Sequence, residues 1–293
     1  MMARRIRLPV VLLAAGVLVA GSSRSSAWWD DGHAIVAKVA ADRLTPHAKA
    51  AVKEILKNDP TGQTLVAVSG WADTVRRTPM PETYNWHFVD IPLDAQPPTY
   101  DAARDCQPTP KGDCVVAALD RLVITLKDPT ASPTERAQAL KFITHFVGDL
   151  HQPLHCAERN HDAGGNDVRV TFFGATHQSP PFQTSPWNLH AVWDGGMIDQ
   201  TGRSRTAYVK YLKDWIATQN AVVIASGSFV DWANETHAQA VDHAYRTANG
   251  SKAFPASGGK VGQKYQSANI KVVDQQLAKA GVRLAKVLND ALP

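Results

Sequence analysis

Apolar residues recur every three or four positions along most of this chain, which is the pattern of amphipathic helices. In the first half the pattern predicts helices over residues 32–44, 45–58, 64–77, 114–128 and 132–151. In the second half it predicts helices over about 188–199, 204–226, 228–246 and 269–292. Thr45 and Ser132 mark two clear starts, because each places a capping hydroxyl before a proline, and Ser132 is followed by Glu135 as in a capping box.

One segment has the composition of a strand instead. Residues 167–174, DVRVTFFG, predict a single strand, which we expect to belong to at most a minor hairpin. Proline-rich loops at 91–110 and 174–187 and a Gly/Lys-rich loop at 249–264 separate the helices, and none is long enough to divide domains. The chain therefore predicts one all-α globular domain over residues 28–293.

Residues 1–27 have the features of a secretory signal peptide. A basic start, MMARRIR, precedes a 14-residue apolar run at 8–21 and a small-residue segment that ends at Ala27. An uncleaved anchor is the alternative, but this run is short for a membrane span and no second apolar run follows. We expect a secreted or periplasmic protein without stable membrane association.

Removal of that segment changes the charge of the chain. Four of the 31 basic residues, Arg4, Arg5, Arg7 and Arg24, lie within it, which leaves 27 basic residues against 27 acidic ones. Net charge therefore gives no support for a broad basic face of the kind that binds nucleic acid through phosphate neutralisation alone. Any phosphate chemistry must be organised locally.

The three cysteines fall into a pair and a single residue. Cys106 and Cys114 flank a short Pro/Gly loop, and in an exported protein such a pair predicts a small disulfide. Cys156 follows His155 directly and is either an inert buried thiol or, if oxidised, a poor neighbour for a metal site.

Histidine and aspartate recur at helical spacing. His145 with Asp149, and His190 with Asp194, are each four residues apart and share a helix face. Imidazole and carboxylate are usual zinc ligands, although one such pair is more often a surface ion pair or a hydrogen-bonded core histidine. Two pairs, with His155 just past Pro153, favour metal binding, and further candidates complete a set of eight: His33, Asp73, His87, His145, Asp149, His155, His190 and Asp194.

The order of the motifs along the chain resembles that of a known protein family. The chain contains WWDDGH, WAD, HFVD, HFVGDLHQPLH, GGN and NLHAVWD in that order, over essentially all of residues 28–293. In this it resembles the secreted zinc-dependent single-strand nucleases of the S1/P1 family, whose mostly helical fold is of the phospholipase C/nuclease type. The resemblance implies hydrolysis of single-stranded DNA and RNA, and of 3′-nucleotides, by a monomeric enzyme.

The resemblance also implies three zinc ions and their ligands. Asp73, His87, His145 and Asp149 would surround the first. His155, His190 and Asp194 would bind the second. His33 and Trp28 would bind the third, with Asp149 bridging the first and third, and Trp28 would contribute an α-amino group that exists only after signal removal. Such an amine deprotonates readily beside a cation, whereas an internal amide does not.

Roles in catalysis follow from the same resemblance. A hydroxide between two cations would attack phosphorus while a third cation stabilises the departing 3′ oxygen, which leaves 5′-phosphate products. Asp73 would orient the attacking water, and Arg76 would bind the developing phosphoryl charge. Phe88 and Asp90 would hold an unpaired base by stacking and by hydrogen bonds to its edge, and Asn166 would place its amide near the phosphate or the metal cluster. The structural alternatives are core packing for Phe88, a solvated helix residue for Arg76 and a turn residue for Asn166.

Two other functions stay open at this stage. A zinc-dependent phospholipase C shares the expected fold, but that family has glutamate where this chain has Asp194. A non-catalytic zinc-binding protein could use the same donors. The 174–187 loop could add a stacking surface through Phe182 or Trp187, or could be inert. The remaining histidines match no ligand position: His47, His151, His161, His177, His237 and His243.

Overall fold

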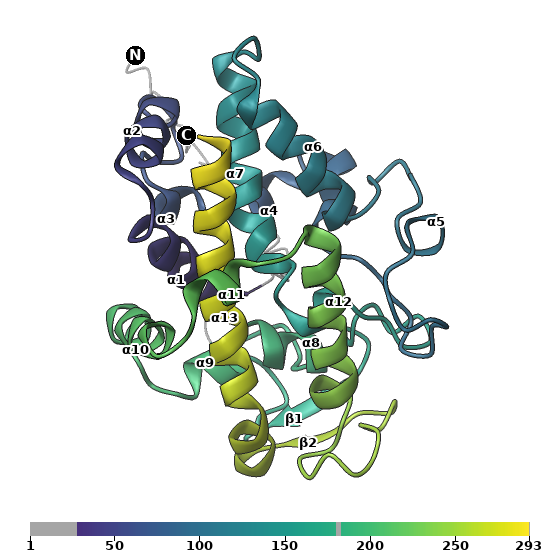
Figure 1. Cartoon of the computed structure of the whole chain (residues 1–293). Coiled ribbons are helices and arrows are strands. Elements are labelled where there is room, and N and C mark those ends of the chain that lie inside the picture. The colour runs from purple at the N-terminus through teal and green to yellow at the C-terminus, as the bar shows by residue number, and fades with distance from the viewer. Residues whose placement is uncertain (1–27, 180–182, 293) are drawn as a thin grey trace, which may run out of the picture.

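The computed structural model describes residues 28–179 and 183–292, and helices dominate it (Figure 1). The proposed signal peptide lies outside the described residues. In the first half the helices are α1 Asp30–Ala41, α2 Pro46–Ile55, α3 Leu65–Val68, α4 Trp71–Val75, η1 Pro81–His87, α5 Ala102–Asp105, α6 Val115–Lys127, α7 Pro133–Asp149 and η2 Pro153–His155. In the second half they are α8 Leu189–Ala191, η3 Val192–Gly196, α9 Met197–Asp199, α10 Arg205–Ala217, α11 Ala221–Ala225, α12 Phe229–Gln239, η4 Ala240–Ala244 and α13 Gln263–Ala291. The prediction of a mostly helical domain is confirmed.

The predicted helix starts are confirmed at the level of hydrogen bonds. The Thr45 hydroxyl accepts a hydrogen bond from the backbone of Ala48, and Ser132 and Glu135 form a complete capping box at the start of α7. Each of these caps satisfies backbone donors that would otherwise lack a partner at the first turn.

The long C-terminal helix α13 organises the packing. It runs beside α1, α7 and α10 across the front of the molecule (Figure 1). The backbones of α1 and α13 approach closely at Gly281, where an added Cβ would lie 2.5 Å from Val39 Cγ1. The C-terminal half of α7, from Ala139 to Asp149, is buried throughout. That burial places His145 and Asp149 inside the molecule rather than on its surface.

Four of the predicted helices differ in detail from the observed ones. The helix expected over 64–77 is interrupted at Ser69 and Gly70, which separate α3 from α4, and the one expected over 204–226 ends at Ala217 before α11 begins. The helices expected over 188–199 and 228–246 each contain a π turn, η3 and η4. Apolar spacing does not distinguish a continuous helix from one with a break or a wider turn, because both keep similar side chains on one face.

The expected minor hairpin is replaced by a long-range parallel pair. Strand β1, Val170–Phe172, pairs with β2, Gly259–Val261, with Val170 opposite Gly259. The sequence did not reveal β2, because three residues in a Gly/Lys-rich loop carry too short a pattern. The start of α13 also differs, since it lies six residues before the expected position.

The predicted cysteine pairing is confirmed, since Cys106 and Cys114 form a disulfide with their Cα atoms 5.0 Å apart. Cys156 is buried, its thiol contacts the carbonyl of Leu150, and burial raises its pKa well above the ordinary value. This favours the inert-thiol reading of Cys156.

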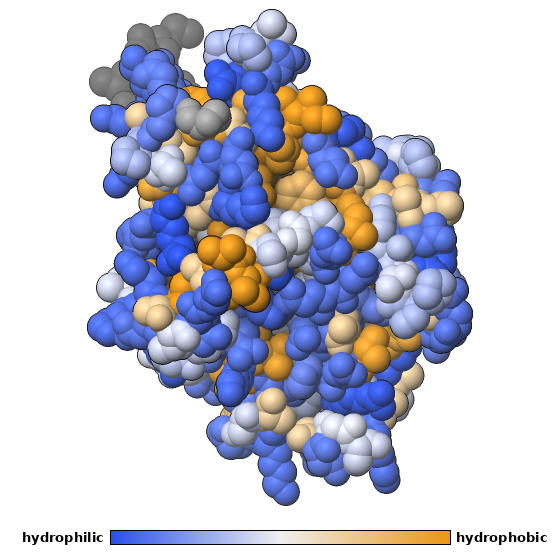
Figure 2. Space-filling view, in the orientation of Figure 1, coloured by the Kyte–Doolittle hydropathy of each residue, from blue (hydrophilic) through white to orange (hydrophobic). Residues whose placement is uncertain are grey.

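The surface is mostly hydrophilic on the face that carries α11 and α13, with separate hydrophobic areas (Figure 2). On α11 the exposed apolar side chains are Val222 and Val223. Among the described helices, none combines the length and apolar character needed to cross a bilayer.

Candidate active site

The first histidine–aspartate pair lies at the buried end of α7. His145 and Asp149 are both fully buried, and the helical i, i+4 spacing brings His145 Nε2 within 3.3 Å of Asp149 Oδ2. Two other elements add donors to this position. His87, the last residue of η1, places Nδ1 3.0 Å from the same carboxylate oxygen, and Asp73 of α4 places Oδ2 3.6 Å from His145 Nε2. Donor atoms of Asp73, His87 and His145 all lie within 4.8 Å of one another.

His33 of α1 approaches Asp149 from another direction. Its Nε2 lies 3.2 Å from Asp149 Oδ1, and its ring stacks on that of His145 with the centroids 3.7 Å apart. One oxygen of Asp149 therefore faces His33, while the other faces His87 and His145. This single carboxylate connects two groups of possible metal ligands.

The second pair forms a separate group. His190 of α8 and Asp194 of the π turn η3 place Nε2 and Oδ2 3.3 Å apart, and His155 of η2 places its Nε2 3.1 Å from that of His190. These three side chains are buried, and their donor atoms lie within 4.8 Å of one another. The structure thus brings all eight sequence-predicted side chains into three groups.

Backbone carbonyls fix the tautomers of three imidazoles. The Nδ1 atoms of His145, His155 and His190 lie 2.6 to 2.8 Å from the carbonyl oxygens of Ser69, His87 and Gly164, respectively. Because a carbonyl oxygen can only accept, Nδ1 must carry the proton in each ring. In the neutral ring Nε2 then holds a lone pair. This orientation, with Nδ1–H on a carbonyl and Nε2 directed into the group, is typical of metal-binding histidines.

The donor groups fit a metal ion, because several of their polar atoms are buried without a partner. Both ring nitrogens of His33, Nε2 of His87 and of His145, and Oδ1 of Asp149 are buried without a hydrogen-bond partner among the described residues. Buried polar atoms of this kind are costly unless something satisfies them. The facing Nε2 atoms of His155 and His190 would also repel in their neutral forms. Imidazole nitrogen and carboxylate oxygen in groups of three are typical zinc ligands.

The first group consists of Asp73, His87, His145 and Asp149, and its charges favour a cation at this position. Burial opposes the charged form of His145, yet Asp149 and Asp73 raise the pKa of His145 to about 9. Burial also opposes ionisation of Asp149, but His145 and two further imidazoles lower the pKa of that carboxyl well below the ordinary value. Two carboxylates therefore stabilise a cation here, whether a proton or a metal ion carries the charge.

In the second group, burial favours the neutral forms of the side chains. Burial, together with His155, lowers the pKa of His190 to about 3, so its imidazole stays neutral and available as a ligand. Burial raises the pKa of Asp194 well above the ordinary value, although Gln152 donates a hydrogen bond to Oδ1. A cation between these side chains would favour the ionised form of Asp194.

Trp28 is held against the same cluster. Its side chain is fully buried, and the indole Nε1 donates a 2.8 Å hydrogen bond to the carbonyl of Gly148, next to Asp149. The backbone N–H of Trp29 donates to the carbonyl of Asp194 at 3.0 Å. An added Cβ at Gly148 would lie 2.9 Å from His33 Nδ1, which shows how tightly these segments pack. The chain at Trp28 is thus fixed between α7 and the π turn.

A pocket of about 290 Å³ adjoins the second group. It brings together residues that the sequence placed in substrate binding, and it also contains residues that the sequence did not indicate. The lining residues are Arg76, Tyr84, Phe88, Asp90, Leu154, Glu158, Ala163, Gly164, Asn166 and His190.

The pocket has a cationic side near the metal-ligand groups. Arg76 places Nε 3.3 Å from Asp73 Oδ1, and its guanidinium lies over the ring of Tyr84, 5.5 Å from the centroid. Arg76 is buried, unlike the exposed Arg77, which argues against the solvated-helix alternative for Arg76. Tyr84 was not predicted, and no spacing signal identified it.

An aromatic ring and carboxyl groups also line the pocket. Phe88 is only partly buried and meets Tyr84 edge to face at 6.5 Å, so its ring is not simply part of the core. Burial, followed by the charges of Glu158, Asp105 and Asp162, raises the pKa of Asp90 to about 7. Asn166 lines the pocket, but its amide also donates to the carbonyl of Ala163, as expected of a turn residue.

Two other predictions concern residues near these groups. His151 donates from Nδ1 to the carbonyl of Val147 and accepts from Arg283 at Nε2, so it belongs to none of the three groups. Trp187 is buried against Trp29 and Phe172, which removes it as an exposed stacking surface. Phe182 lies outside the described residues.

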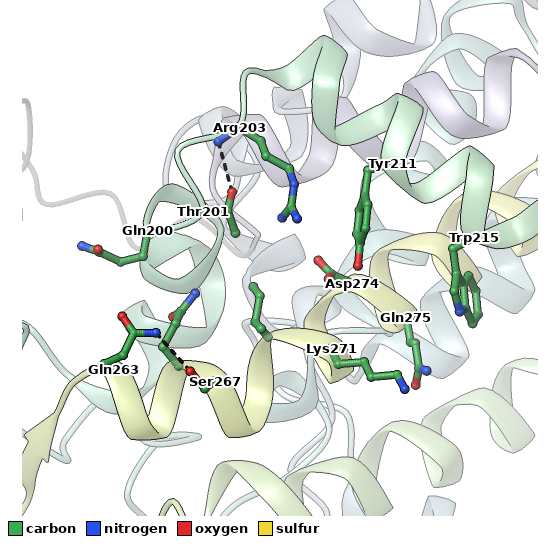
Figure 3. A pocket seen from close by; sticks show the side chains of 12 residues that line it. Gln200, Thr201, Arg203, Tyr211, Trp215, Gln263, Ser267, Lys271, Asp274 and Gln275 are labelled. Atoms are coloured by element: carbon green, nitrogen blue, oxygen red, sulfur yellow. Dashed lines mark hydrogen bonds between the residues drawn. The ribbon is translucent and has the colours of Figure 1, made fainter.

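A second cavity, of about 400 Å³, lies between α10 and α13 (Figure 3). Tyr211 and Trp215 project into it from α10, and Asp274 from α13, where the Tyr208 hydroxyl hydrogen-bonds to the carboxylate. The described residues that line this cavity include no histidine or cysteine, so they do not form a comparable metal site.

Comparison with known proteins gives a consistent result along the whole described chain. The family model of the S1/P1 nucleases matches residues 28–293. Endonuclease 2 of Arabidopsis thaliana is 30% identical, with the match covering 98% of this chain and 99% of the relative. Nuclease P1 of Penicillium citrinum is 29% identical over 90% of this chain and 97% of its own, and nuclease S1 of Aspergillus oryzae is 32% identical over 66% and 62%.

The raised pKa of Asp90 predicts a specific pH dependence of stability. Because the folded state favours the neutral carboxyl, stability is lost as the pH rises from the ordinary value of 3.8 through about 7. Asparagine cannot ionise, so Asp90→Asn avoids this loss. The unfolding free energy of Asp90→Asn minus that of the natural protein should therefore be about 2 kcal/mol larger at pH 8 than at pH 5. Urea unfolding at both pH values measures this. The exposed Asp94 supplies the control Asp94→Asn, and equal pH dependence of all three proteins would contradict the assignment.

Proposed function

Because the chain belongs to the S1/P1 nuclease family, we propose that it is a secreted, zinc-dependent endonuclease that hydrolyses phosphodiester bonds of single-stranded DNA and RNA to 5′-phosphate products and also acts on 3′-nucleotides. Metal-dependent hydrolysis of phosphodiester bonds follows from the family, whereas zinc, the strand preference and export are proposed here. The observation that carries the proposal is the convergence of three donor groups beside a pocket that contains Arg76.

Nine residues would hold three zinc ions. The first site would use Asp73, His87, His145 and Asp149, the second His155, His190 and Asp194, and the third His33, Trp28 and Asp149. Oδ1 of Asp149 faces His33, and Oδ2 faces His87 and His145, which supports Asp149 as a ligand common to the first and third sites. Bound zinc would supply Lewis acidity at the phosphate and would lower the pKa of water at the site.

The side chains around that centre would position the reacting groups. Asp73, next to Arg76, can orient the attacking water and accept its proton. Arg76 is held between Asp73 and the Tyr84 ring, with its guanidinium at the pocket wall. From there it can donate hydrogen bonds to the phosphoryl oxygens as negative charge develops on them.

The pocket favours an unpaired base. Phe88 offers a ring for stacking, Asp90 offers a carboxyl group to the base edge, and Asn166 offers an amide near His190. A base within a duplex presents neither its face nor its Watson–Crick edge, so such a pocket selects single strands.

Processing would complete the third site. Residues 1–27 would be removed as a signal peptide, which makes Trp28 the first residue and gives it the α-amino group proposed as a ligand. The position of Trp28 supports this, since its side chain is buried beside Gly148 and its carbonyl accepts from the His33 backbone. Export and metal loading would thus be coupled.

The proposal is tested with mature protein that begins at Trp28. Single-stranded DNA should be cut to 5′-phosphate fragments, and a chelator should abolish this activity until zinc is restored. Hydrolysis of phosphatidylcholine instead of DNA would favour the phospholipase C reading. Bound zinc without cleavage of nucleic acid or 3′-nucleotides would favour a non-catalytic zinc-binding protein.

Metal content should respond differently to two aspartate variants. Asp149→Asn should lose about two of three zinc ions because its oxygens face two donor groups, whereas Asp194→Asn should lose one. Elemental analysis of the dialysed proteins measures the ratio. Asp274→Asn changes a buried carboxylate outside the three groups and should retain all three ions. Equal losses in the first two variants would count against a bridging role for Asp149.

Arg76 should contribute to turnover more than to metal binding. We expect Arg76→Ala to lower kcat by about 10²–10³-fold, as for removal of a transition-state donor, with zinc content unchanged. The exposed neighbour provides the control Arg77→Ala, which should retain nearly full activity. A similar kcat in both variants would remove Arg76 from the proposed mechanism.

A further inference from the structure

The pocket wall at Tyr84 adjoins a loop that the proposed mechanism does not use. This loop, residues 106–114, has a disulfide between its ends. It is bound to η1 directly after Tyr84, because Asn85 N–H donates to the carbonyl of Lys111 at 2.8 Å and the Asn85 side-chain amide donates to Thr109 Oγ1 at 3.1 Å. The loop is therefore attached to the element that supplies part of the pocket wall.

The packing around Gly112 leaves this loop little freedom. Gly112 has a φ of 100°, and an added Cβ there would lie 2.5 Å from the carbonyl oxygen of Glu82 and 2.6 Å from Trp86 Cδ1. The backbone N–H and carbonyl of Gly112 also bond to the carbonyl and N–H of Thr109, at 3.0 and 3.1 Å. Lys111 lies within this turn, so its backbone is fixed relative to η1.

The side chain of Lys111 lies beside the ring of Tyr84. Its Nζ is 5.2 Å from the ring centroid, and the guanidinium carbon of Arg76 is 5.5 Å from the same centroid. Both distances are typical of cation–π contacts. The two cationic groups cannot be more than about 11 Å apart, which is the sum of these distances. Arg76 and Tyr84 line the pocket, whereas Lys111 is exposed and lies outside it.

Lys111 keeps its charge available to a ligand. Among the described carboxylates, none lies within ion-pair distance of Lys111 Nζ. The neighbouring cation differs in this respect, because Arg121 is paired with Asp113 of the same loop. An ammonium group that has no carboxylate partner and is placed next to a phosphate-binding pocket attracts further phosphates.

A bound single strand presents such a further phosphate. A nucleotide has six backbone bonds, twice as many as an amino-acid residue, so successive phosphates of an extended strand lie about 7 Å apart. With one phosphate at Arg76, the next is within reach of the flexible Lys111 side chain, because the two cations lie at most about 11 Å apart. A 3′-mononucleotide has no second phosphate to offer.

We propose that Lys111 binds the phosphate adjacent to the reacting one and thereby makes oligonucleotides bind more tightly than they would through the central pocket alone. The inference rests on the proposed nuclease function and extends the same site along the strand. Lys111 contacts the backbone of the substrate, so its effect is independent of base sequence. It acts on binding and not on the reacting phosphate, so it changes KM and not kcat.

The experiment compares a single-stranded hexanucleotide with 3′-AMP, using metal-loaded proteins. Lys111→Met keeps the apolar stem beside Tyr84 and removes the charge. It should raise KM for the hexanucleotide about threefold, with kcat and the KM for 3′-AMP unchanged. Lys111→Arg should retain the natural KM. Lys127→Met, at the exposed end of α6, removes the same charge elsewhere and is the matched control, with both KM values unchanged.

Salt dependence distinguishes a phosphate contact from a merely structural effect. For the hexanucleotide, the slope of log(kcat/KM) against log[NaCl] should be shallower by about 0.7 in Lys111→Met than in the natural protein, because one phosphate contact fewer releases fewer counterions. An unchanged slope, or equal weakening with the hexanucleotide and with 3′-AMP, would overturn the inference while cleavage by the natural protein leaves the nuclease function intact.

Failure of the proposed function would be recognised separately. If the natural protein does not cleave, fluorescence anisotropy of the same labelled hexanucleotide gives the salt slope of binding. A slope that depends on Lys111 would then contradict the proposed function alone, whereas equal slopes in the natural protein and Lys111→Met would overturn the inference as well.

Discussion

The structure depends on one constraint, which is that several imidazoles and carboxylates are buried at the end of α7 and require a positive charge among them. His145 and Asp149 lie on a helix face that is fully buried, and His33, His87 and Asp73 converge on it from three other elements. Ionised carboxylates and partnerless ring nitrogens are costly inside a protein. A cation bound at this position interacts favourably with these groups and offsets the cost of burying them. The surrounding helices position its ligands.

The connections between elements also serve this centre. The break between α3 and α4 supplies the Ser69 carbonyl that orients His145, and the glycine-containing turn at 163–166 supplies the Gly164 carbonyl that orients His190. His87 has two functions, since its side chain reaches Asp149 and its carbonyl orients His155. The donor groups are therefore coupled through the backbone as well as through Asp149. A displacement of the side chains in one group would shift those in another.

Much of this arrangement could be predicted from the sequence, and the remainder could not for identifiable reasons. Helical periodicity and capping residues located the main helices, and the i, i+4 pairs together with the family resemblance identified all eight side chains of the donor groups. Local pattern could not show the parallel pairing of β1 with β2, because that register depends on residues far apart in the chain. Tyr84 and Glu158 were not predicted either, since a tyrosine or glutamate in a loop has no characteristic spacing, and only the folded backbone brings each to the pocket.

The central claim is that the three donor groups hold zinc in the mature protein. Anomalous diffraction from crystals of protein beginning at Trp28, collected on both sides of the zinc absorption edge, tests it most directly. Three anomalous peaks are expected, each at about 2.0–2.2 Å from imidazole or carboxylate donor atoms, with two of them sharing Asp149. Peaks located away from these side chains, or a fully folded protein without any peak among them, would contradict it.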